Sequence, residues 1–437
     1  MSIGLWTRWM ALHAVPKAFM SFQGRTGNPM GALISSHGKG IDPYPLMERI
    51  RQRGPLVKTP FVWVTVDHEV AREILRDKRF GVTPPTGMGM PKPVQKLLDR
   101  TDPKVANPVE PPAMVIVDPP AHTQYRQLVA QSFTPRAIDK LDARVAEVTA
   151  ELIERLAGAS HPDLIADFAS VLPVAMIAEI LGLSGESHAQ LLEWGHDGAP
   201  LLDVGIPWRT YRRGIDGMRG LDGFLTDLFD KVRAGAADDN PFTKMAADHT
   251  LTDHELAANA ALLIGAGFET TVNLIGNGIV LLQQHPDQLT LLRDNPDLWP
   301  AAVEEILRIE SPVQMTARTA QCDLEMAGQR LPAGTMVAVL LGGANRDPRV
   351  FTEPTRFDIT RPNARDHLAF ASGIHVCLGA ALARIEGATA LRALFEAYPD
   401  LRLTETPRPR GLVNLHGYVK LPALLGTRRT EPAGLVC

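Results

Sequence analysis

The hydrophobic and polar positions predict a short β region in the first fifth of the chain. Residues 56–66 (LVKTPFVWVTV) are rich in β-branched and aromatic side chains, which is typical of strands. The HEVAREILRD that follows at residues 68–77 has apolar residues at helical spacing. Strand-like pieces return only late, at residues 324–326 and 336–341. We therefore expect a minor β component without alternating βαβ units.

Helical periodicity dominates residues 137–284, so the predicted fold class is mainly α with a minor β region (α+β). Two stretches rich in Pro and Gly, residues 82–93 and 107–120, flank a short polar helix candidate. Together they are predicted to form one long loop region, and long loops in compact domains are often functional. Loops that interrupt the helical part are expected near residues 158–162, 200–207 and 235–241.

The longest predicted helix begins at LTDHE, where Thr252 and Glu255 form a capping box. No proline follows until Pro286, which gives about 32 residues, or roughly 48 Å. The helix is apolar on most faces, so it is either a membrane span or the axis of a helical protein. Glu269 and Asn273 argue against lipid, where a carboxylate costs at least about 2.5 kcal/mol. We expect a buried core helix.

Composition and charge narrow the function classes. The chain has 437 residues and a formal net charge of −4, which gives no support for nucleic-acid binding. The chain has three cysteines, which are too few and too scattered for a disulfide framework: Cys322, Cys377 and Cys437. It contains no C-x-x-C motif that would indicate a zinc site. These features favour a reducing, cytoplasmic setting.

The N-terminal 20 residues, MSIGLWTRWMALHAVPKAFM, lack the pattern of a cleaved signal and are too short to span a bilayer. A helix or tail packed on the protein is the favoured interpretation, and a weak interfacial helix that contacts a membrane peripherally is the alternative. We expect residues 1–41 to be an N-terminal extension of a single catalytic domain formed by residues 42–437.

The segment AGFETT places polar groups in the middle of the core helix. Leu263, Ala266, Gly267 and Thr270 share one face by their spacing, and the two small residues leave that face nearly bare. A mid-helix threonine usually bonds back to a carbonyl and bends the helix. A neighbouring Glu269 shifts the interpretation towards a site that handles protons.

The segment AVEEILRIESP holds Glu305 and Arg308 at i, i+3 on a helix, where they can pair. Pairs of this spacing are common and contribute little when exposed. Arg356 lies in a later proline-rich segment, from which a second guanidinium could join Glu305.

The stretch FASGIHVCLG places Cys377 between glycines and just before a helical run. A lone cysteine is most often a small buried hydrophobe. A thiol close to a helix N-terminus instead faces free N–H groups, which favour the thiolate. His375 has no second pair of ligands nearby, which argues against zinc. These local features leave both interpretations open.

Taken together, these residues resemble the cytochrome P-450 family of haem-thiolate monooxygenases. Phe370, Gly373, His375, Cys377 and Gly379 match its haem segment F-x-x-G-x-[HR]-x-C-x-G. Ala371 departs from the pattern, because many relatives have glycine there.

Three further motifs occur in the family's order. AGFETT is similar to the oxygen-activation motif, and Glu305-x-x-Arg308 to the family's E-x-x-R. DPPAHTQYR resembles the helix in which a histidine and an arginine, here His122 and Arg126, hold a haem propionate. The resemblance extends from about residue 43 to 425.

The resemblance implies a role for each of these residues. Cys377 would be the axial ligand of the haem iron, with Phe370 and Gly379 in the loop around its sulfur. Thr270 and Glu269 would deliver protons during O₂ activation. His122, Arg126, Arg318 and His375 would pair with the propionates, Ala266 and Gly267 would leave room for O₂, and Glu305, Arg308 and Arg356 would form a structural network.

The resemblance also implies the cofactors and partners. The family uses haem b and O₂, with two electrons from NAD(P)H through a ferredoxin and its reductase. We expect a monomer that hydroxylates or epoxidises a hydrophobic fatty acid, terpenoid, steroid or polyketide. We also expect a soluble bacterial member of the family, of actinobacterial type. The alternatives are a peroxide-driven peroxygenase or isomerase and, ranked last, a haem-binding gas sensor.

Overall fold

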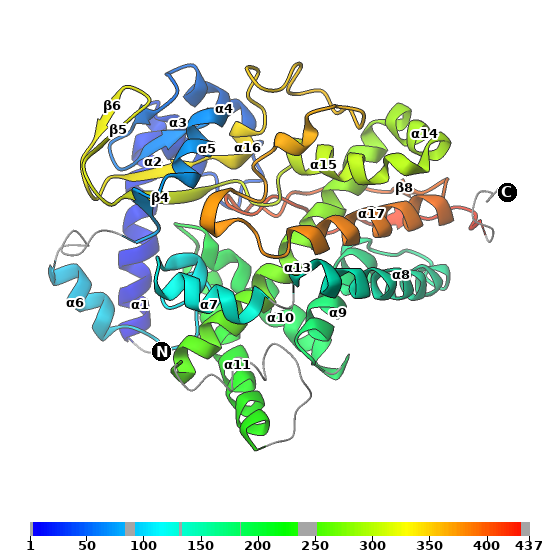
Figure 1. The fold of residues 1–437 in the computed structure, drawn as a ribbon, viewed down its shortest axis with the longest axis horizontal. Coiled ribbons are helices and arrows are strands. Elements are labelled where there is room, and N and C mark those ends of the chain that lie inside the picture. Colours follow the sequence, from blue (N-terminus) through cyan, green and yellow to red (C-terminus); the bar gives the residue numbers. More distant parts are fainter. Residues whose placement is uncertain (1–2, 84–91, 131–132, 184, 235–250, 430–437) are drawn as a thin grey trace.

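The computed structural model describes residues 3–83, 92–130, 133–183, 185–234 and 251–429. Helices dominate it, as the sequence predicts; strands β4 Thr316–Ala320, β5 Leu324–Met326 and β6 Gln329–Leu331 lie at the left of Figure 1, and β8 Arg402–Leu403 lies at the right. The N-terminal half contains α1 Ile3–Trp9, α2 Val15–Arg25, α3 Pro29–Ile34, α4 Tyr44–Arg51, α5 His68–Arg76, α6 Lys92–Arg100, α7 Ala121–Ala130, α8 Pro135–Ala157, α9 Val171–Ile180, α10 His188–Gly198 and α11 Trp208–Arg233. The C-terminal half contains α13 Asp253–Gln284, α14 Pro286–Asp294, α15 Trp299–Ile309, α16 Leu341–Ala344 and α17 Ala380–Ala397.

Helix α13 runs through the centre of the molecule (Figure 1). Thr252 and Glu255 form the predicted capping box, and the helix has 32 residues. Its length and hydropathy would suit a membrane span, but 67% of its most apolar window is buried within the protein. Helices α9, α10, α11, α15 and α17 all pack against it. The prediction of a core helix is therefore confirmed.

The main sheet has five strands in the order β1-β2-β7-β4-β3. Among the strands that the structure describes, only the β2–β7 pair is parallel, and there is no βαβ layering. Helix α5 and strands β5 and β7 are present as predicted. Strand β4 was not predicted, because its threonines and arginine form no apolar run. The strands are β1 Val57–Lys58, β2 Trp63–Thr65, β3 Phe80–Gly81, β4 Thr316–Ala320, β5 Leu324–Met326, β6 Gln329–Leu331, β7 Met336–Val339, β8 Arg402–Leu403 and β9 Ala423–Leu424.

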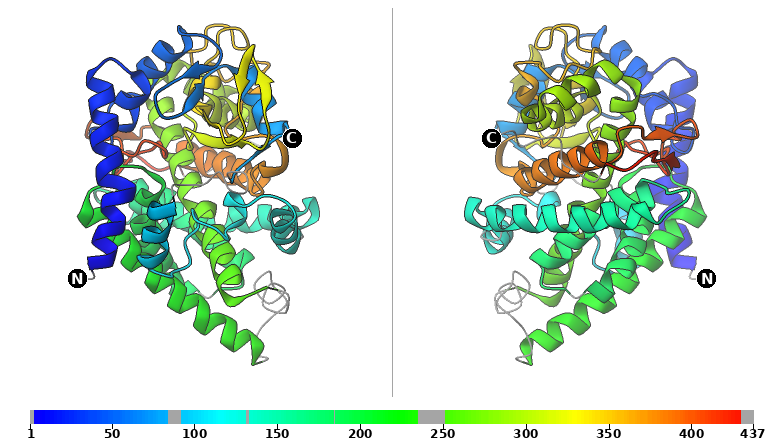
Figure 2. Two further views of the ribbon diagram at one scale, coloured as in Figure 1. Left: turned by 90° about the vertical axis from the view of Figure 1, so that its left-hand side faces the viewer. Right: turned by 90° about the vertical axis from the view of Figure 1, so that its right-hand side faces the viewer.

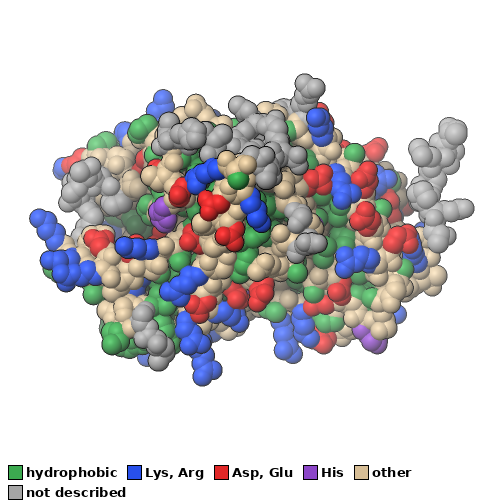
Figure 3. All heavy atoms as spheres, turned by 90° about the horizontal axis from the view of Figure 1, so that it is seen from below, with side chains coloured by type: hydrophobic (Ala, Val, Ile, Leu, Met, Phe, Trp, Pro, Cys, Tyr) green, Lys and Arg blue, Asp and Glu red, His purple; other side chains and the backbone are tan. Residues whose placement is uncertain are grey.

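The N-terminal residues form a long helical run along one edge of the molecule (Figure 2). The Arg8 guanidinium bonds the Leu98 carbonyl at 2.9 Å, and the Trp9 indole N–H bonds the Ile206 carbonyl at 2.9 Å. The run is thus packed on the protein, as the favoured interpretation expected. Elsewhere, Lys and Arg side chains are interspersed with Asp and Glu over the face shown in Figure 3.

Candidate active site

Cys377 lies in a bent loop that leads into α17. The loop turns at Gly373, whose φ of 74° suits glycine and whose added Cβ would meet the Leu75 carbonyl oxygen. The Cys377 N–H bonds the Phe370 carbonyl at 3.0 Å, which closes the loop. Burial raises the pKa of the thiol, whereas a hydrogen bond from the Gly379 N–H to the sulfur opposes that rise. The side chain nevertheless has open surface, so the sulfur is deep in the protein and accessible to a ligand.

Ala371 adopts a backbone conformation that ordinarily belongs to glycine. Its φ of 57° lies in the left-handed region, where a Cβ costs roughly 1–2 kcal/mol. Alanine at position 371, where many relatives have glycine, therefore strains the backbone. The small size of its methyl group alone would not predict this strain.

We predict that Ala371→Gly raises the free energy of unfolding by about 0.5–1 kcal/mol. Relief of the left-handed strain is partly offset by the greater freedom of glycine in the unfolded chain. Urea unfolding of the haem-loaded protein measures the change, and Ala369→Gly in the same loop is the control that should destabilise. A destabilised Ala371→Gly variant would contradict the assignment of strain.

Four basic side chains converge on the same side as the loop. His122 and Arg126 come from α7, Arg318 comes from β4, and His375 precedes the cysteine. The His122 and His375 rings lie 4.2 Å apart, and Arg126 donates to the Val376 carbonyl at 2.9 Å. The structure thus brings the four predicted residues together from distant parts of the chain.

Within the described part of the chain, the cluster holds more basic groups than acidic ones. Burial and the charges of Arg318 and His122 lower the pKa of His375 to about 3, and burial lowers the pKa of Arg318 to about 10. Both His122 ring nitrogens and His375 Nε2 are buried without a hydrogen-bond partner. Asp118 is the acidic group that acts on this cluster electrostatically, and the N–H groups of Val82 and Thr83 already bond its oxygens. The donor set is suited to an anionic ligand.

The middle of α13 has one interruption in its burial. Ala266 is exposed and Thr270 half-buried, whereas residues 271–282 are all buried. The Thr270 hydroxyl donates to the Ala266 carbonyl at 3.0 Å, as expected for a mid-helix threonine. An added Cβ at Gly267 would meet Ile177 of α9 at 2.9 Å, so this glycine lets α9 pack closely, and its role in leaving room for O₂ stays a prediction. Gly265 is the glycine whose missing side chain leaves open space.

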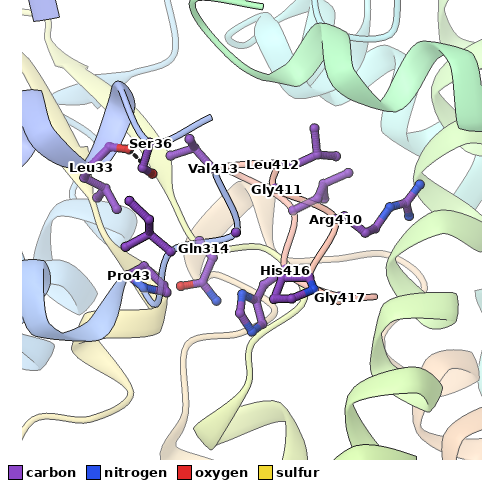
Figure 4. Close-up of a pocket in the computed structure, with 14 residues that line it drawn as sticks. Leu33, Ser36, Pro43, Gln314, Arg410, Gly411, Leu412, Val413, His416 and Gly417 are labelled. Carbon is purple, nitrogen blue, oxygen red and sulfur yellow. Dashed lines mark hydrogen bonds between the residues drawn. The ribbon is translucent and has the colours of Figure 1, made fainter. Parts of the chain in front are cut away.

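Glu269 is buried and forms an ion pair with Arg410, which sequence reasoning did not identify. The Arg410 guanidinium also lies 3.0 Å from His196 Nδ1 and 3.4 Å from Asn273 Oδ1. Arg410 and Gln314 both line a small pocket. The Arg410 side chain points away from Gln314 (Figure 4). Arg410 comes from an irregular segment about 140 residues after Glu269, so no local pattern indicated the pair.

Glu305 and Arg308 form a fully buried bidentate pair on α15. Two N–H···O bonds of 2.7 Å join them, and neither side chain is exposed. The second guanidinium on Glu305 belongs to Arg361, at 3.1 Å, so the prediction for the Arg356 side chain is wrong. Arg356 instead pairs with exposed Glu353 and contributes its carbonyl oxygen to Arg308 at 3.1 Å. Both arginines lie in the same segment, and sequence alone could not tell which one turns inwards.

Glu304, the neighbour of Glu305, anchors both ends of the cysteine loop. Its carboxylate contacts His367 at 3.0 Å and Arg384 at 2.8 Å, which lie on either side of Cys377 in sequence. Burial opposes its ionisation, but hydrogen bonds from His367 and Arg384 lower the pKa of Glu304 to about 2. Phe370 packs under the Arg384 guanidinium at 4.6 Å. Two consecutive acids on an apolar helix were the signal that could have indicated this second anchor.

Comparison with known proteins decides the family. The cytochrome P-450 family profile matches residues 229–409. Cytochrome P-450 140 of Mycobacterium tuberculosis is 41% identical over 97% of this chain and 98% of its own length. The chain belongs to the cytochrome P-450 family. It is a haem-thiolate monooxygenase that uses haem b as its cofactor and O₂ as a co-substrate.

Other cytochromes P-450 show the same relationship. The 6-deoxyerythronolide B hydroxylase of Saccharopolyspora erythraea is 35% identical over 85% of this chain and 92% of its own length. A solved cytochrome P-450, P450BioI in complex with an acyl carrier protein ligated to hexadec-9Z-enoic acid, superposes with a TM-score of 0.78. It is 34% identical and covers 88% of this chain and 98% of its own. The match to the mycobacterial relative extends into the first 41 residues, beyond the part of the chain that carries the motifs.

The residues present fit haem in this cytochrome P-450. The unpartnered nitrogens of His122 and His375 and the buried Arg318 are donors for two propionates. An accessible thiol with a backbone N–H at its sulfur suits the axial ligand of iron. Among the described residues, no group of three or more His, Cys, Asp and Glu could hold a separate metal ion. Cys437 lies outside the described residues.

Proposed function

We propose that this cytochrome P-450 hydroxylates or epoxidises a hydrophobic organic molecule of the fatty acid, terpenoid, steroid or polyketide class. The observation that carries the proposal is the accessible Cys377 thiol combined with the open stretch of α13 at Ala266 and Thr270. The names of relatives support the substrate class, since one is a 6-deoxyerythronolide B hydroxylase and a solved neighbour was crystallised with myristic acid.

Haem bound through the Cys377 thiolate would supply O₂ activation, because the thiolate donates electron density that favours O–O cleavage. His122, Arg126, Arg318 and His375 would hold its propionates by charge-assisted hydrogen bonds. Two electrons would come from NAD(P)H through a ferredoxin and its reductase, and the reaction would take place in the cytoplasm. The monooxygenase route is favoured over the peroxide-driven one because Thr270 and Glu269 are both present.

Thr270 and Glu269 would handle the protons that O₂ activation consumes. The Thr270 hydroxyl lies on the open stretch of α13 and can donate there once it leaves the Ala266 carbonyl. Glu269 is one residue away, but its ion pair keeps the carboxylate at Arg410. Proton delivery by Glu269 therefore requires the Arg410 contact to open, which makes Arg410 a positioning residue for this step.

We predict that Thr270→Ala lowers the product formed per NADPH by roughly tenfold and diverts the electrons into hydrogen peroxide, because the hydroxyl donor is lost. Hydrophobic compounds that convert the haem from low to high spin provide the substrate for this assay. NADPH consumption, peroxide and product are then measured together. Thr270→Ser keeps the hydroxyl and should restore coupling, whereas unchanged coupling in Thr270→Ala would refute the role.

A further inference from the structure

The N-terminal helical run presents an apolar face to the outside. Helix α1, the π-helical turn Met10–Ala14 and α2 form one run along the edge of the molecule (Figure 2). Every exposed residue between positions 3 and 22 is apolar, whereas a surface helix normally turns polar residues outwards. These residues are Ile3, Trp6, Val15, Ala18, Phe19 and Phe22, and the five larger ones are 43–84% exposed.

Two polar side chains of the run, those of Arg8 and His13, face the protein instead. Arg8 is buried and bonds Glu110 at 2.8 Å, and buried His13 accepts a hydrogen bond from the Gly205 N–H at 3.3 Å. Leu5 is buried in a small cluster with Ile206. Because these contacts fix the rotation of the run about its axis, its apolar face cannot turn inwards.

The apolar face continues onto the neighbouring loop. Leu202 and Val204 are 38% and 44% exposed. An added Cβ at Gly205 would lie 3.1 Å from the Lys17 side chain, which places this loop directly beside α2. We call Ile3, Trp6, Val15, Phe19, Phe22, Leu202 and Val204 the N-terminal apolar face. Contiguous exposed apolar surface of this kind marks an interaction site.

Charge indicates what covers the N-terminal apolar face. Residues 1–41 contain Arg8, Lys17, Arg25 and Lys39 but no Asp or Glu, although the whole chain carries a net charge of −4. Exposed Arg49 and Arg53 both lie against the Gly27 carbonyl, at 3.5 and 3.1 Å, close to the end of α2. Apolar and aromatic side chains bordered by basic ones are the composition of a helix that lies in a membrane interface.

We propose that the N-terminal apolar face lies on the surface of an anionic lipid membrane. The aromatic and aliphatic side chains would enter the headgroup region, while Lys17, Arg25 and the neighbouring arginines contact anionic headgroups. A second copy of the chain is the competing occupant. In a two-fold dimer this basic segment would face its own copy, so like charges would meet at the interface.

Vesicle co-sedimentation of the full-length haem-loaded protein tests the proposal. Binding to phosphatidylcholine vesicles that also contain phosphatidylglycerol should be at least roughly tenfold stronger than to phosphatidylcholine alone, and salt should weaken it. The variant Ile3→Ser/Val15→Ser/Phe22→Ser should lose at least about tenfold in affinity. These side chains are exposed, so the haem spectrum should be unchanged. Met336→Ser/Val419→Ser, which alters exposed apolar residues elsewhere, is the matched control.

Three results would overturn the proposal. One is failure of the protein to sediment with the anionic vesicles, and another is equal binding by the triple variant. The third is a dimer in lipid-free light scattering that the same triple variant converts to a monomer, because that result assigns the face to a second copy.

Discussion

Replacing Glu305 by glutamine should lower the free energy of unfolding by about 3–5 kcal/mol and leave little haem-loaded protein. Glu305 is fully buried and balances two guanidinium groups, those of Arg308 and Arg361. Glutamine keeps the size of the side chain but removes its charge, so both arginines would remain buried without a counter-ion. A loss of this size is a large part of the stability of an ordinary domain.

Of the two arginines, Arg308 cannot relax easily. Arg308 also donates to the Asn345 and Pro354 carbonyls at 2.9 and 2.8 Å, which fix it in place. Urea unfolding and the ratio of haem to protein absorbance after purification measure the effect. Glu353→Gln is the matched control, since it removes an exposed i, i+3 pair with Arg356 and should change stability by no more than about 0.5 kcal/mol. A stable, fully loaded Glu305→Gln variant would show that the network is not structural.

Local patterns predicted those parts of the fold that local physics determines. The capping box at Thr252 and the uninterrupted apolar run predicted both ends of α13 to within a residue. This was possible because the residues that determine its start, length and burial are adjacent in the sequence. Strand β4 was missed because its pairing with β7 and β3 comes from distant segments. Its polar residues, Arg318 among them, carry no apolar alternation that would reveal a strand.

The same division holds for the active site. The Cys377 loop and its glycine turn could be predicted from ten consecutive residues, and the four basic residues from the family resemblance. The Arg410–Glu269 pair and the choice of Arg361 over Arg356 could not, since each depends on which of several arginines in an irregular segment turns inwards. Glu304 was overlooked for a related reason, because its partners His367 and Arg384 lie more than 60 residues away.

Replacing Cys377 by serine should abolish monooxygenase turnover and remove the spectroscopic signature of thiolate-ligated haem. In the unmodified protein the reduced carbonyl complex should show a strongly red-shifted Soret band. A serine hydroxyl is a far weaker acid than a thiol and lacks sulfur's capacity to donate electron density to iron, so the variant should lose that band. The propionate partners His122, Arg126, Arg318 and His375 are unaltered, so haem itself can still bind.

Cys322→Ser supplies the matched control. Cys322 is an exposed free thiol between strands β4 and β5, and its replacement should leave the red-shifted band and turnover intact. If Cys377→Ser kept the band, another thiol would have to ligate the iron, and Cys322 and Cys437 are the remaining candidates in the sequence. Loss of the band in Cys377→Ser alone would tie the ligand to Cys377, whose sulfur meets the Gly379 N–H in a loop anchored at both ends by Glu304.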